Sequence, residues 1–166
     1  IIGITGTLGA GKGTVVDYLV EKKGFRHYSV RDFLTVELKQ RGLEVNRDSL
    51  RDVANELREK NGPAYIVETL YQRALEQNLN CIIESIRCPG ELEALNLKPN
   101  FEFWAVDAKP EIRYQRICKR GTSTDNISYE VFLNQELAEM RNTDPFKQNL
   151  AECISRARFV FKIMVL

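Results

Sequence analysis

The stretch Gly6–Thr14 constrains the fold more than any other part of the chain, because it matches the pattern G-x-x-x-x-G-K. The residues before it, Ile1–Thr5, form a short apolar run typical of a buried strand. Val15–Lys23 has the pattern of a helix that ends at Gly24. A glycine-rich turn between a strand and a helix directs backbone N–H groups into one concavity, and the helix N-terminus adds partial positive charge. This context predicts a phosphate site in which Lys12 reaches the outer phosphates of a nucleoside triphosphate. A chance glycine-rich turn is the alternative.

Length and charge restrict what can surround this stretch. The chain has 166 residues, enough for a single domain with its own core. Its 24 Lys and Arg nearly balance its 23 Asp and Glu, which gives no sign of a surface for nucleic acid. Neither an apolar run of membrane-spanning length nor the pattern of a signal peptide is present, so we expect no membrane partner. The first residue is not Met, which is compatible with a segment of a longer protein.

Cysteine and histidine are too sparse and scattered to indicate a metal site or a Cys–His catalytic pair. The chain has no C-x-x-C pair and a single histidine. We expect reduced thiols in a cytoplasmic protein, some of them buried as small apolar groups. His27 lies in a short predicted strand and is expected to be a packing residue rather than a base. The four cysteines are Cys81, Cys88, Cys118 and Cys153.

Strand-like and helix-like segments alternate along the chain. The strands expected after the first are Phe25–Val30, Cys81–Ile83, Phe101–Val106 and Arg158–Leu166. The helices expected after the first are 32–40, 50–60, 64–77, 91–95, 111–120, 129–141 and, opened by Asp144-Pro145, a last one to about Ala157. Ser29–Asp32 is expected to be a polar turn, and Asn46–Ser49 offers helix-capping side chains before the helix expected at 50–60. The alternation predicts an α/β fold, a parallel sheet with helices on both faces and a ligand crevice at the carboxyl ends of the strands.

Two charged residues follow the third predicted strand closely and are candidates for that crevice. Glu84 comes directly after the apolar run, where a carboxylate can hold Mg²⁺, usually through water. An ordinary carboxylate at a strand end is the alternative. Arg87 is three residues further on, and its planar guanidinium suits bidentate contact with a second phosphate group. A surface arginine is the alternative for this position.

Three arginines recur on the helix predicted after the fourth strand. Arg113, Arg116 and Arg120 are spaced i, i+3 and i+7, which places them on one helix face. Like charges on one face repel each other unless an anion compensates them, and a polyphosphate or a solvated surface would both serve. The adjacent loop Gly121–Asn126 is polar and suits a lid that excludes water during group transfer.

These residues together resemble a known superfamily. The run G-x-x-G-x-G-K-G-T of Gly6–Thr14 resembles the phosphate loop of adenylate kinases and other P-loop nucleoside monophosphate kinases. The whole chain is similar to dephospho-CoA-kinase-like and adenylate-kinase-related proteins, notably at Glu56-Leu57-Arg58 and at Ile83–Arg87. The resemblance implies a three-layer α/β/α P-loop NTPase fold with a five-stranded parallel sheet in the order 2-3-1-4-5. It implies one kinase domain over 1–166, with acceptor-binding helices at about 32–77 and a lid region at about 116–142.

The resemblance also implies an ATP-dependent phosphotransferase that uses Mg²⁺ and acts on a small phosphorylated acceptor, a nucleoside monophosphate or a dephospho-CoA-like metabolite. Lys12 would follow the transferred phosphoryl group, with Glu84 near Mg²⁺ and Arg87 on the phosphate of the acceptor. Arg116 and Arg120 would neutralise charge during transfer. The ATP phosphates would lie in the cradle Gly9, Ala10, Gly11, Lys12, Gly13 and Thr14, and the acceptor-binding helices would contribute Asp32 and Arg58.

The chain departs from that pattern at four positions. Gly13 stands where most P-loop NTPases have a hydroxyl, which leaves Thr14 as the weaker substitute for metal ligation. Thr35 stands where nucleoside monophosphate kinases usually have an arginine. Arg31 or Lys39 could compensate for its absence. Glu84 stands in place of aspartate, and Ala157-Arg158 stands where dephospho-CoA kinases have Ala-Asp. These departures keep open a second class of function, an ATP-binding regulatory domain without acceptor turnover.

Overall fold

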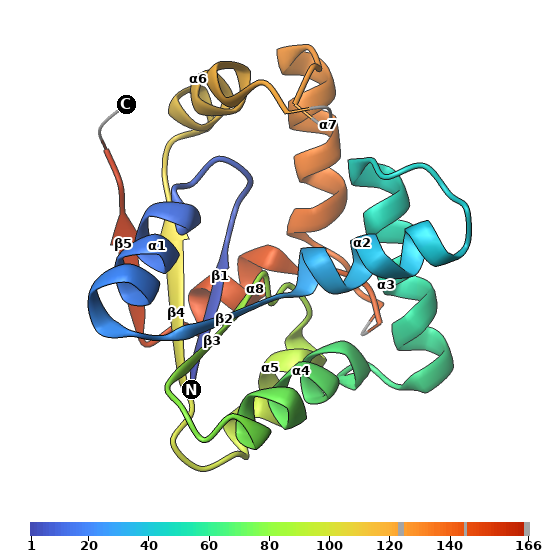
Figure 1. The fold of residues 1–166 in the computed structure, drawn as a ribbon. Helices are drawn as coiled ribbons and strands as arrows, with labels where there is room; N and C mark the ends of the chain where they lie inside the picture. The colour runs from blue at the N-terminus through green and yellow to red at the C-terminus, as the bar shows by residue number, and fades with distance from the viewer. Residues whose placement is uncertain (123–124, 145, 165–166) are drawn as a thin grey trace.

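The computed structural model describes residues 1–122, 125–144 and 146–164 (Figure 1). Within these ranges the strands are β1 (Ile2–Gly6), β2 (Arg26–Ser29), β3 (Cys81–Glu84), β4 (Glu102–Asp107) and β5 (Phe159–Lys162). The helices are α1 (Lys12–Lys23), α2 (Val30–Gln40), α3 (Arg47–Asn61), α4 (Tyr65–Glu76), α5 (Pro89–Asn96), α6 (Pro110–Arg120), α7 (Tyr129–Met140) and α8 (Leu150–Ser155). None of these helices is long and apolar enough to cross a bilayer.

The strands form one parallel sheet in the order β2-β3-β1-β4-β5. This confirms the predicted fold class and strand order. The register pairs Ile4 of the central strand β1 with Glu84 of β3. Because parallel strands end at the same edge of a sheet, the glycine-rich loop after β1 and the carboxylate of Glu84 lie beside each other.

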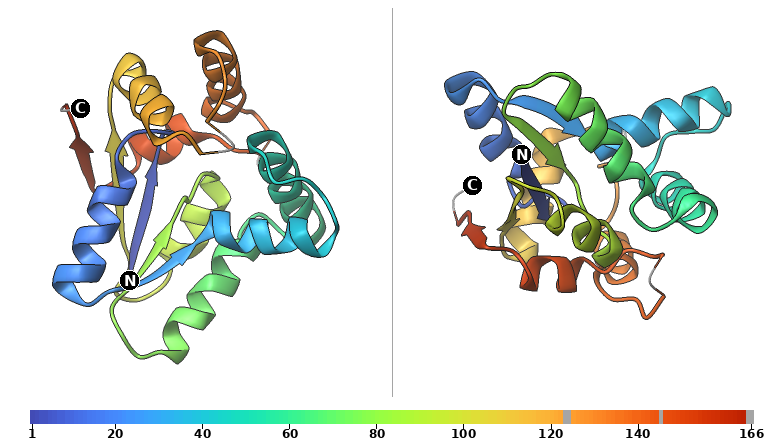
Figure 2. Two further views of the ribbon diagram at one scale, coloured as in Figure 1. Left: turned by 45° about the horizontal axis from the view of Figure 1, so that its top comes forward. Right: turned by 90° about the horizontal axis from the view of Figure 1, so that it is seen from below.

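Helices cover both faces of the sheet (Figures 1 and 2). The neighbouring residues Ile82 and Ile83 of β3 point to opposite faces and belong to two separate buried clusters. Ile82 packs in the cluster that contains Val16 of α1. Ile83 packs in the cluster that contains Tyr71 of α4 and Cys153 of α8. Burial on both faces explains why β1 and β3 have near-continuous apolar sequences.

Helices α2 and α3 form an arm that extends beyond the sheet (Figure 1). The arm packs through apolar stripes, with Leu34 of α2 and Leu50 of α3 both buried. A capping box begins α3, because Asn46 accepts the N–H of Ser49 at 2.9 Å and Ser49 accepts the N–H of Asn46 at 3.0 Å. The predicted capping segment before this helix is thereby confirmed, and it places Arg47 in the first turn of α3.

Two helices begin at residues other than those predicted. The segment expected as a polar turn is instead a helix start, because the hydroxyl of Ser29 accepts the N–H of Asp32 at 3.1 Å and caps α2 from Val30 onwards. The last helix is shorter than predicted and is capped by Asn149. Asp144 closes a local turn, in which it accepts the N–H of Phe146 at 3.0 Å. Pro145, with which the predicted helix was to open, lies outside the described residues.

The final strand is also shorter than predicted. Among the described residues β5 covers only Phe159–Lys162, pairs with β4 alone, and has exposed side chains along its length. Residues 165–166 of the predicted strand lie outside the described residues. Its position at the sheet edge explains this exposure, because an edge strand has a neighbour on one side only.

Candidate functional site

The glycine-rich stretch adopts a conformation that disfavours every residue but glycine at Gly6, Gly9 and Gly11. Gly9 has φ +77° and Gly11 has φ +102°. A Cβ on Gly9 would lie 2.5 Å from the carbonyl oxygen of Arg113, and a Cβ on Gly11 would lie 2.8 Å from Cδ1 of Ile163. Gly11 is the N-cap of α1 and has no side chain to satisfy the N–H groups of the first turn. The loop therefore presents a concavity of backbone donors suited to an anion.

Lys12 places its ammonium within this concavity. Nζ donates to the carbonyl oxygens of Gly6 at 2.9 Å and of Thr7 at 3.0 Å. Burial lowers the pKa of Lys12 to about 8, and the attraction of Glu84 only partly opposes that effect. A phosphate group would provide the negative charge that this partly buried ammonium lacks.

Glu84 ends β3 beside the loop. Its Oε1 accepts a hydrogen bond from the hydroxyl of Ser85 at 2.7 Å, and its Oε2 lies 3.7 Å from Nε2 of His27. Burial alone would raise the pKa of Glu84, but the contact with His27 and the charge of Lys12 outweigh it and lower the pKa to about 2. The carboxylate is therefore ionised at neutral pH. The side chain of His27 is 33% exposed and lines the pocket, so its expected role as a packing residue is wrong.

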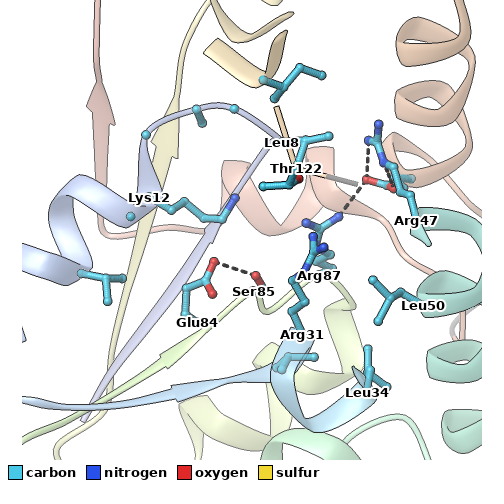
Figure 3. Close-up of a pocket in the computed structure, with 18 of the residues that line it drawn as sticks. Leu8, Lys12, Arg31, Leu34, Arg47, Leu50, Glu84, Ser85, Arg87 and Thr122 are labelled. Carbon is cyan, nitrogen blue, oxygen red and sulfur yellow. Dashed lines mark hydrogen bonds and ion pairs between the residues drawn. The ribbon is translucent and has the colours of Figure 1, made fainter. Parts of the chain in front are cut away.

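The loop opens into a pocket of about 550 Å³. Figure 3 shows Lys12 and Glu84 in one half of it and Arg31, Arg47 and Arg87 in the other. Its charged lining is predominantly cationic, although the whole chain carries a formal net charge of only +1. The cationic residues of the described lining are Lys12, Arg31, Arg47, Arg51, Arg58, Arg87, Arg116 and Arg120, and the anionic ones are Asp17, Glu84 and Glu139. The pocket therefore suits a ligand with several negative charges.

Arg87, Arg116 and Arg120 all line this pocket. Arg87 follows β3, and its Nη1 donates to Oε2 of Glu139 at 2.8 Å. Arg116 of α6 lies over the glycine-rich loop, where its Nη1 donates to the carbonyl oxygen of Ala10 at 3.1 Å. Arg120 is held by two hydrogen bonds of 2.7 Å to the carboxylate of Asp125. Residues 123 and 124 of the predicted lid loop lie outside the described residues.

Arg113 does not share this position, and neither alternative for the three arginines of α6, a common anion or a solvated face, holds for it. Its side chain is buried, its Nε donates to the carbonyl oxygen of Ala108 at 2.7 Å, and its Nη1 pairs with Glu136 of α7. The guanidinium also lies over the ring of Phe132. Spacing of i, i+3 and i+7 spreads side chains over an arc of the helix, and α7 covers the part of the arc that holds Arg113.

Asp32 and Arg58 also differ from what the resemblance implies. Asp32 is exposed on α2 and does not belong to the described lining, which its neighbour Arg31 joins instead. Arg58 reaches the lining, but it is 1 % exposed and donates to Oε1 of Glu91 from Nε at 3.0 Å and from Nη2 at 2.7 Å. The guanidinium of Arg58 is therefore already neutralised inside the protein.

Several lining residues escaped the sequence reasoning, and some of them are charged or polar. Arg47 and Arg51 lie on α3, Glu139 lies on α7, and Gln148 precedes α8. The capping segment before α3 was a signal for the helix start, but it did not indicate what the first turn faces. Gln148 is 5 % exposed, and its Oε1 is a buried atom without a hydrogen-bond partner in the described part of the chain.

The donors available for a metal ion are few. No group of three or more His, Cys, Asp or Glu residues that could hold one occurs among residues 1–122, 125–144 and 146–164. Thr14 and Glu84 both line the pocket next to the loop. One hydroxyl and one ionised carboxylate suit Mg²⁺, which keeps several waters and takes phosphate oxygens as ligands. They do not suit a structural zinc site.

Comparison with known proteins shows the family to which the chain belongs. A family model described as an AAA domain matches residues 2–142. A UPF0200 protein of Pyrobaculum aerophilum is 32% identical over 162 residues, which cover 96% of this chain and 85% of that protein. Another from Pyrococcus abyssi is 32% identical over 146 residues, covering 84% and 78%.

Solved structures resemble the chain in fold. TT1252 from Thermus thermophilus has a TM-score of 0.62 at 21% identity and covers 99% of this chain and 87% of that one. Shikimate kinase from Bacteroides thetaiotaomicron has a TM-score of 0.53 at 16% identity, covering 97% and 85%. A sugar kinase from a Janibacter species has a TM-score of 0.52 at 17% identity, covering 93% and 90%.

The predicted P-loop kinase fold is confirmed, whereas the adenylate kinase or dephospho-CoA kinase subtype stays a prediction. The chain belongs to the AAA-domain family and to the UPF0200 proteins, and its fold is that of the P-loop kinases.

Proposed function

We propose that this protein is an ATP-dependent kinase that transfers the γ-phosphoryl group to a small phosphorylated acceptor. One observation carries the proposal: a single pocket joins the glycine-rich loop to a second half lined by arginines. The first half suits the phosphates of ATP, since backbone donors, the start of α1 and Lys12 converge there. An enzyme that only hydrolysed ATP would have no need of a second cationic half.

The second half supports a phosphorylated acceptor rather than a neutral one. Arg31 and Arg87 enter it from α2 and from the loop after β3 (Figure 3). Burial lowers the pKa of Arg31, and the neighbouring charges of Arg120 and Arg87 contribute to that shift, which is the signature of cations held close together. Guanidinium groups bind phosphate oxygens in bidentate fashion.

The remainder of the acceptor would lie against an apolar wall. Leu34 of α2 and Leu50 of α3 lie in the same half of the pocket (Figure 3), and Ala54 of α3 also lines the pocket. A nucleoside monophosphate or a dephospho-CoA-like metabolite combines a phosphate group with a base of apolar faces, which fits this wall. In this proposal the helices within 32–77 bind the acceptor, and the region 116–142 acts as the lid. The names of the sugar kinase and the shikimate kinase of similar fold agree with a small-molecule kinase in general.

Phosphoryl transfer depends on positioning and charge neutralisation more than on covalent chemistry. Lys12 would move with the transferred group, and Arg116 and Arg120 would offset the charge that spreads over its oxygens. Arg87 would orient the phosphate of the acceptor in line. Mg²⁺, held by Thr14 and, through water, by Glu84, would supply further charge neutralisation at the β- and γ-phosphates.

The test is an ADP-release assay in which wild-type protein is offered ATP, Mg²⁺ and a panel of acceptors. The panel contains the nucleoside monophosphates and dephospho-CoA, with adenosine and shikimate as acceptors that lack phosphate. We expect turnover with a phosphorylated acceptor only. In Lys12→Ala the turnover number should fall about 100-fold or more, whereas in Arg87→Ala the KM of the acceptor should rise.

Two outcomes would contradict the proposal. Background ADP release with every acceptor, from a protein that binds ATP, would indicate the regulatory ATP-binding domain instead. Wild-type kinetics in both Lys12→Ala and Arg87→Ala would show that the reaction takes place elsewhere.

A further inference from the structure

Two buried carboxylates hold Arg87 from opposite ends. Glu91 is fully buried, and its Oε2 accepts the backbone N–H of Arg87 at 3.0 Å while its Oε1 is paired with Arg58. Glu139, whose side chain is 3% exposed, accepts Nη1 of Arg87 at 2.8 Å through its Oε2. The carbonyl oxygen of Arg87 accepts the N–H of Asn149 at 2.9 Å. Both the backbone and the guanidinium of this residue are therefore fixed.

The contact with Glu139 leaves part of the guanidinium of Arg87 available. Nε and Nη2 of Arg87 have no hydrogen-bond partner among the described residues, and the side chain lies in the pocket (Figure 3). Arg47 differs, because its Nε and Nη2 donate to the two oxygens of Glu139 at 2.7 Å and 3.0 Å and its Nη1 donates to Gln135 at 3.2 Å. Arg47 thus anchors Glu139, and Arg87 is the partner that can still bind a ligand.

We infer that Glu139 is a positioning residue that holds Arg87 with its remaining N–H groups towards the phosphate of the acceptor. The inference rests on the proposed function for the identity of that ligand. A guanidinium fixed before binding loses less conformational freedom when the phosphate arrives, so fixation strengthens binding. Because Arg47 belongs to α3 and Glu139 to α7, this arrangement also requires that α7 packs against α3.

The charge state of Glu139 agrees with this role. Burial would raise the pKa of its carboxyl group, but the nearby charge of Arg87 and the hydrogen bond from Arg47 outweigh that effect and lower the pKa. Glu139 is therefore an anion that orients both arginines. One carboxylate does not neutralise two guanidinium groups, so a net positive charge remains for a phosphate.

Glu136 provides a matched control on the same helix. It pairs with the buried Arg113, as Glu139 pairs with Arg47, and the guanidinium groups of Arg47 and Arg113 both lie over Phe132, at 5.9 Å and 5.5 Å. Neither Glu136 nor Arg113 belongs to the described lining of the pocket. Loss of either carboxylate should lower stability, but only loss of Glu139 should disturb the site.

The test uses inorganic phosphate as the probe in protein whose glycine-rich loop is saturated with ADP and Mg²⁺. Binding is followed by the guanidinium Nε–H NMR signal of Arg87, assigned with Arg87→Lys. We expect a saturable shift in the wild type, affinity at least about tenfold weaker in Glu139→Gln, an intermediate value in Glu139→Asp and a value within about twofold of the wild type in Glu136→Gln. In the kinetic assay, Glu139→Gln should raise the KM of the acceptor more than it lowers kcat.

Several results would overturn the inference. One is a wild-type phosphate affinity in Glu139→Gln. Another is an equal loss of phosphate affinity in Glu139→Gln and Glu136→Gln. A third is an Arg87 NMR signal that does not shift when phosphate is added to the wild type. Urea denaturation of all variants reports stability separately, and Glu139→Asp serves if Glu139→Gln does not fold. A wild type that binds phosphate at Arg87 but turns over no acceptor would reject the proposed function and leave the positioning role intact.

Discussion

The ammonium nitrogen of Lys12 lies 2.9 Å from the carbonyl oxygen of Gly6, so the glycine-rich loop binds its own lysine. A triphosphate must replace such carbonyl contacts with contacts to its phosphates. The exchange is favourable because the ammonium group then contacts a fully charged phosphate oxygen in place of a carbonyl dipole. The position is partly buried, and charges interact more strongly there than in water. This relationship makes the ionisation of Lys12 central to nucleotide binding.

The affinity for ATP should fall as the pH rises through about 8. Burial lowers the pKa of Lys12 to about 8, so the free protein loses the ammonium charge above that pH. If only the protonated form binds, affinity at pH 9 should be about tenfold weaker than at pH 7. Calorimetric titration with a non-hydrolysable ATP analogue measures this. Lys12→Arg, which stays charged, is the control, and the same decline in both proteins would contradict the assignment to Lys12.

Glycines of the loop should differ in their tolerance of a methyl group. Gly9→Ala should lower ATP affinity strongly, because its Cβ would lie 2.5 Å from a backbone carbonyl oxygen and its φ of +77° is strained for alanine. Gly13→Ala should bind ATP nearly as the wild type does, because its Cβ would meet nothing within 4 Å. The same calorimetric titration compares the two variants. Equal affinities would show that the loop is not held as the structure has it.

Arg58 should matter for stability rather than for acceptor binding. Arg58→Met leaves Glu91 buried without its cation, which should lower the free energy of unfolding by about 3–5 kcal/mol. Arg51→Met, which removes contacts to the exposed carboxylates of Asp48 and Asp52, should cost less than about 1 kcal/mol. Urea denaturation measures both. A stable Arg58→Met variant with weakened acceptor binding would show that Arg58 binds the acceptor, as the family resemblance implies.

Arg31 and Asp32 are neighbours that should affect acceptor binding differently. Arg31→Ala should raise the KM of the acceptor about tenfold, the usual effect of losing one charge-assisted hydrogen bond. Asp32→Ala should change it less than about twofold, because that exposed carboxylate does not reach the described lining of the pocket. Initial rates at varied acceptor concentration distinguish the two variants. The reverse pattern would show that α2 presents a different face to the acceptor.

Glu84 should set the requirement for Mg²⁺. In Glu84→Gln the Mg²⁺ concentration for half-maximal turnover should rise at least about tenfold, since the amide lacks the negative charge that attracts the ion. The low pKa of Glu84, about 2, means that this carboxylate does not titrate between pH 5 and 8, so it adds no pH dependence there. Glu102→Gln, at the opposite end of the sheet, is the control. An unchanged Mg²⁺ requirement in Glu84→Gln would exclude the carboxylate from the metal site.

Local sequence sufficed for most of the fold. The apolar strand segments, the capping segment Asn46–Ser49 and the glycine-rich loop act over a few residues, so their spacing predicts strands, helix starts and a phosphate site. Two predictions failed because the local sequence allowed two different structures at the same residue. Ser29 could serve a turn or a helix cap, and Asp144 could cap a helix or close a turn, and only the surrounding packing chose between them.

The amino-acid sequence by itself determined the parallel sheet and the position of Lys12 and Glu84 at one edge of it, because strand periodicity and loop chemistry are short-range properties. Tertiary structure alone decided which arginines face the pocket. Arg58 pairs with Glu91, 33 residues away, and Arg87 pairs with Glu139, 52 residues away. Whether a guanidinium contacts a ligand or a carboxylate depends on which residues the fold places next to it. The spacing of residues along the chain does not predict these contacts.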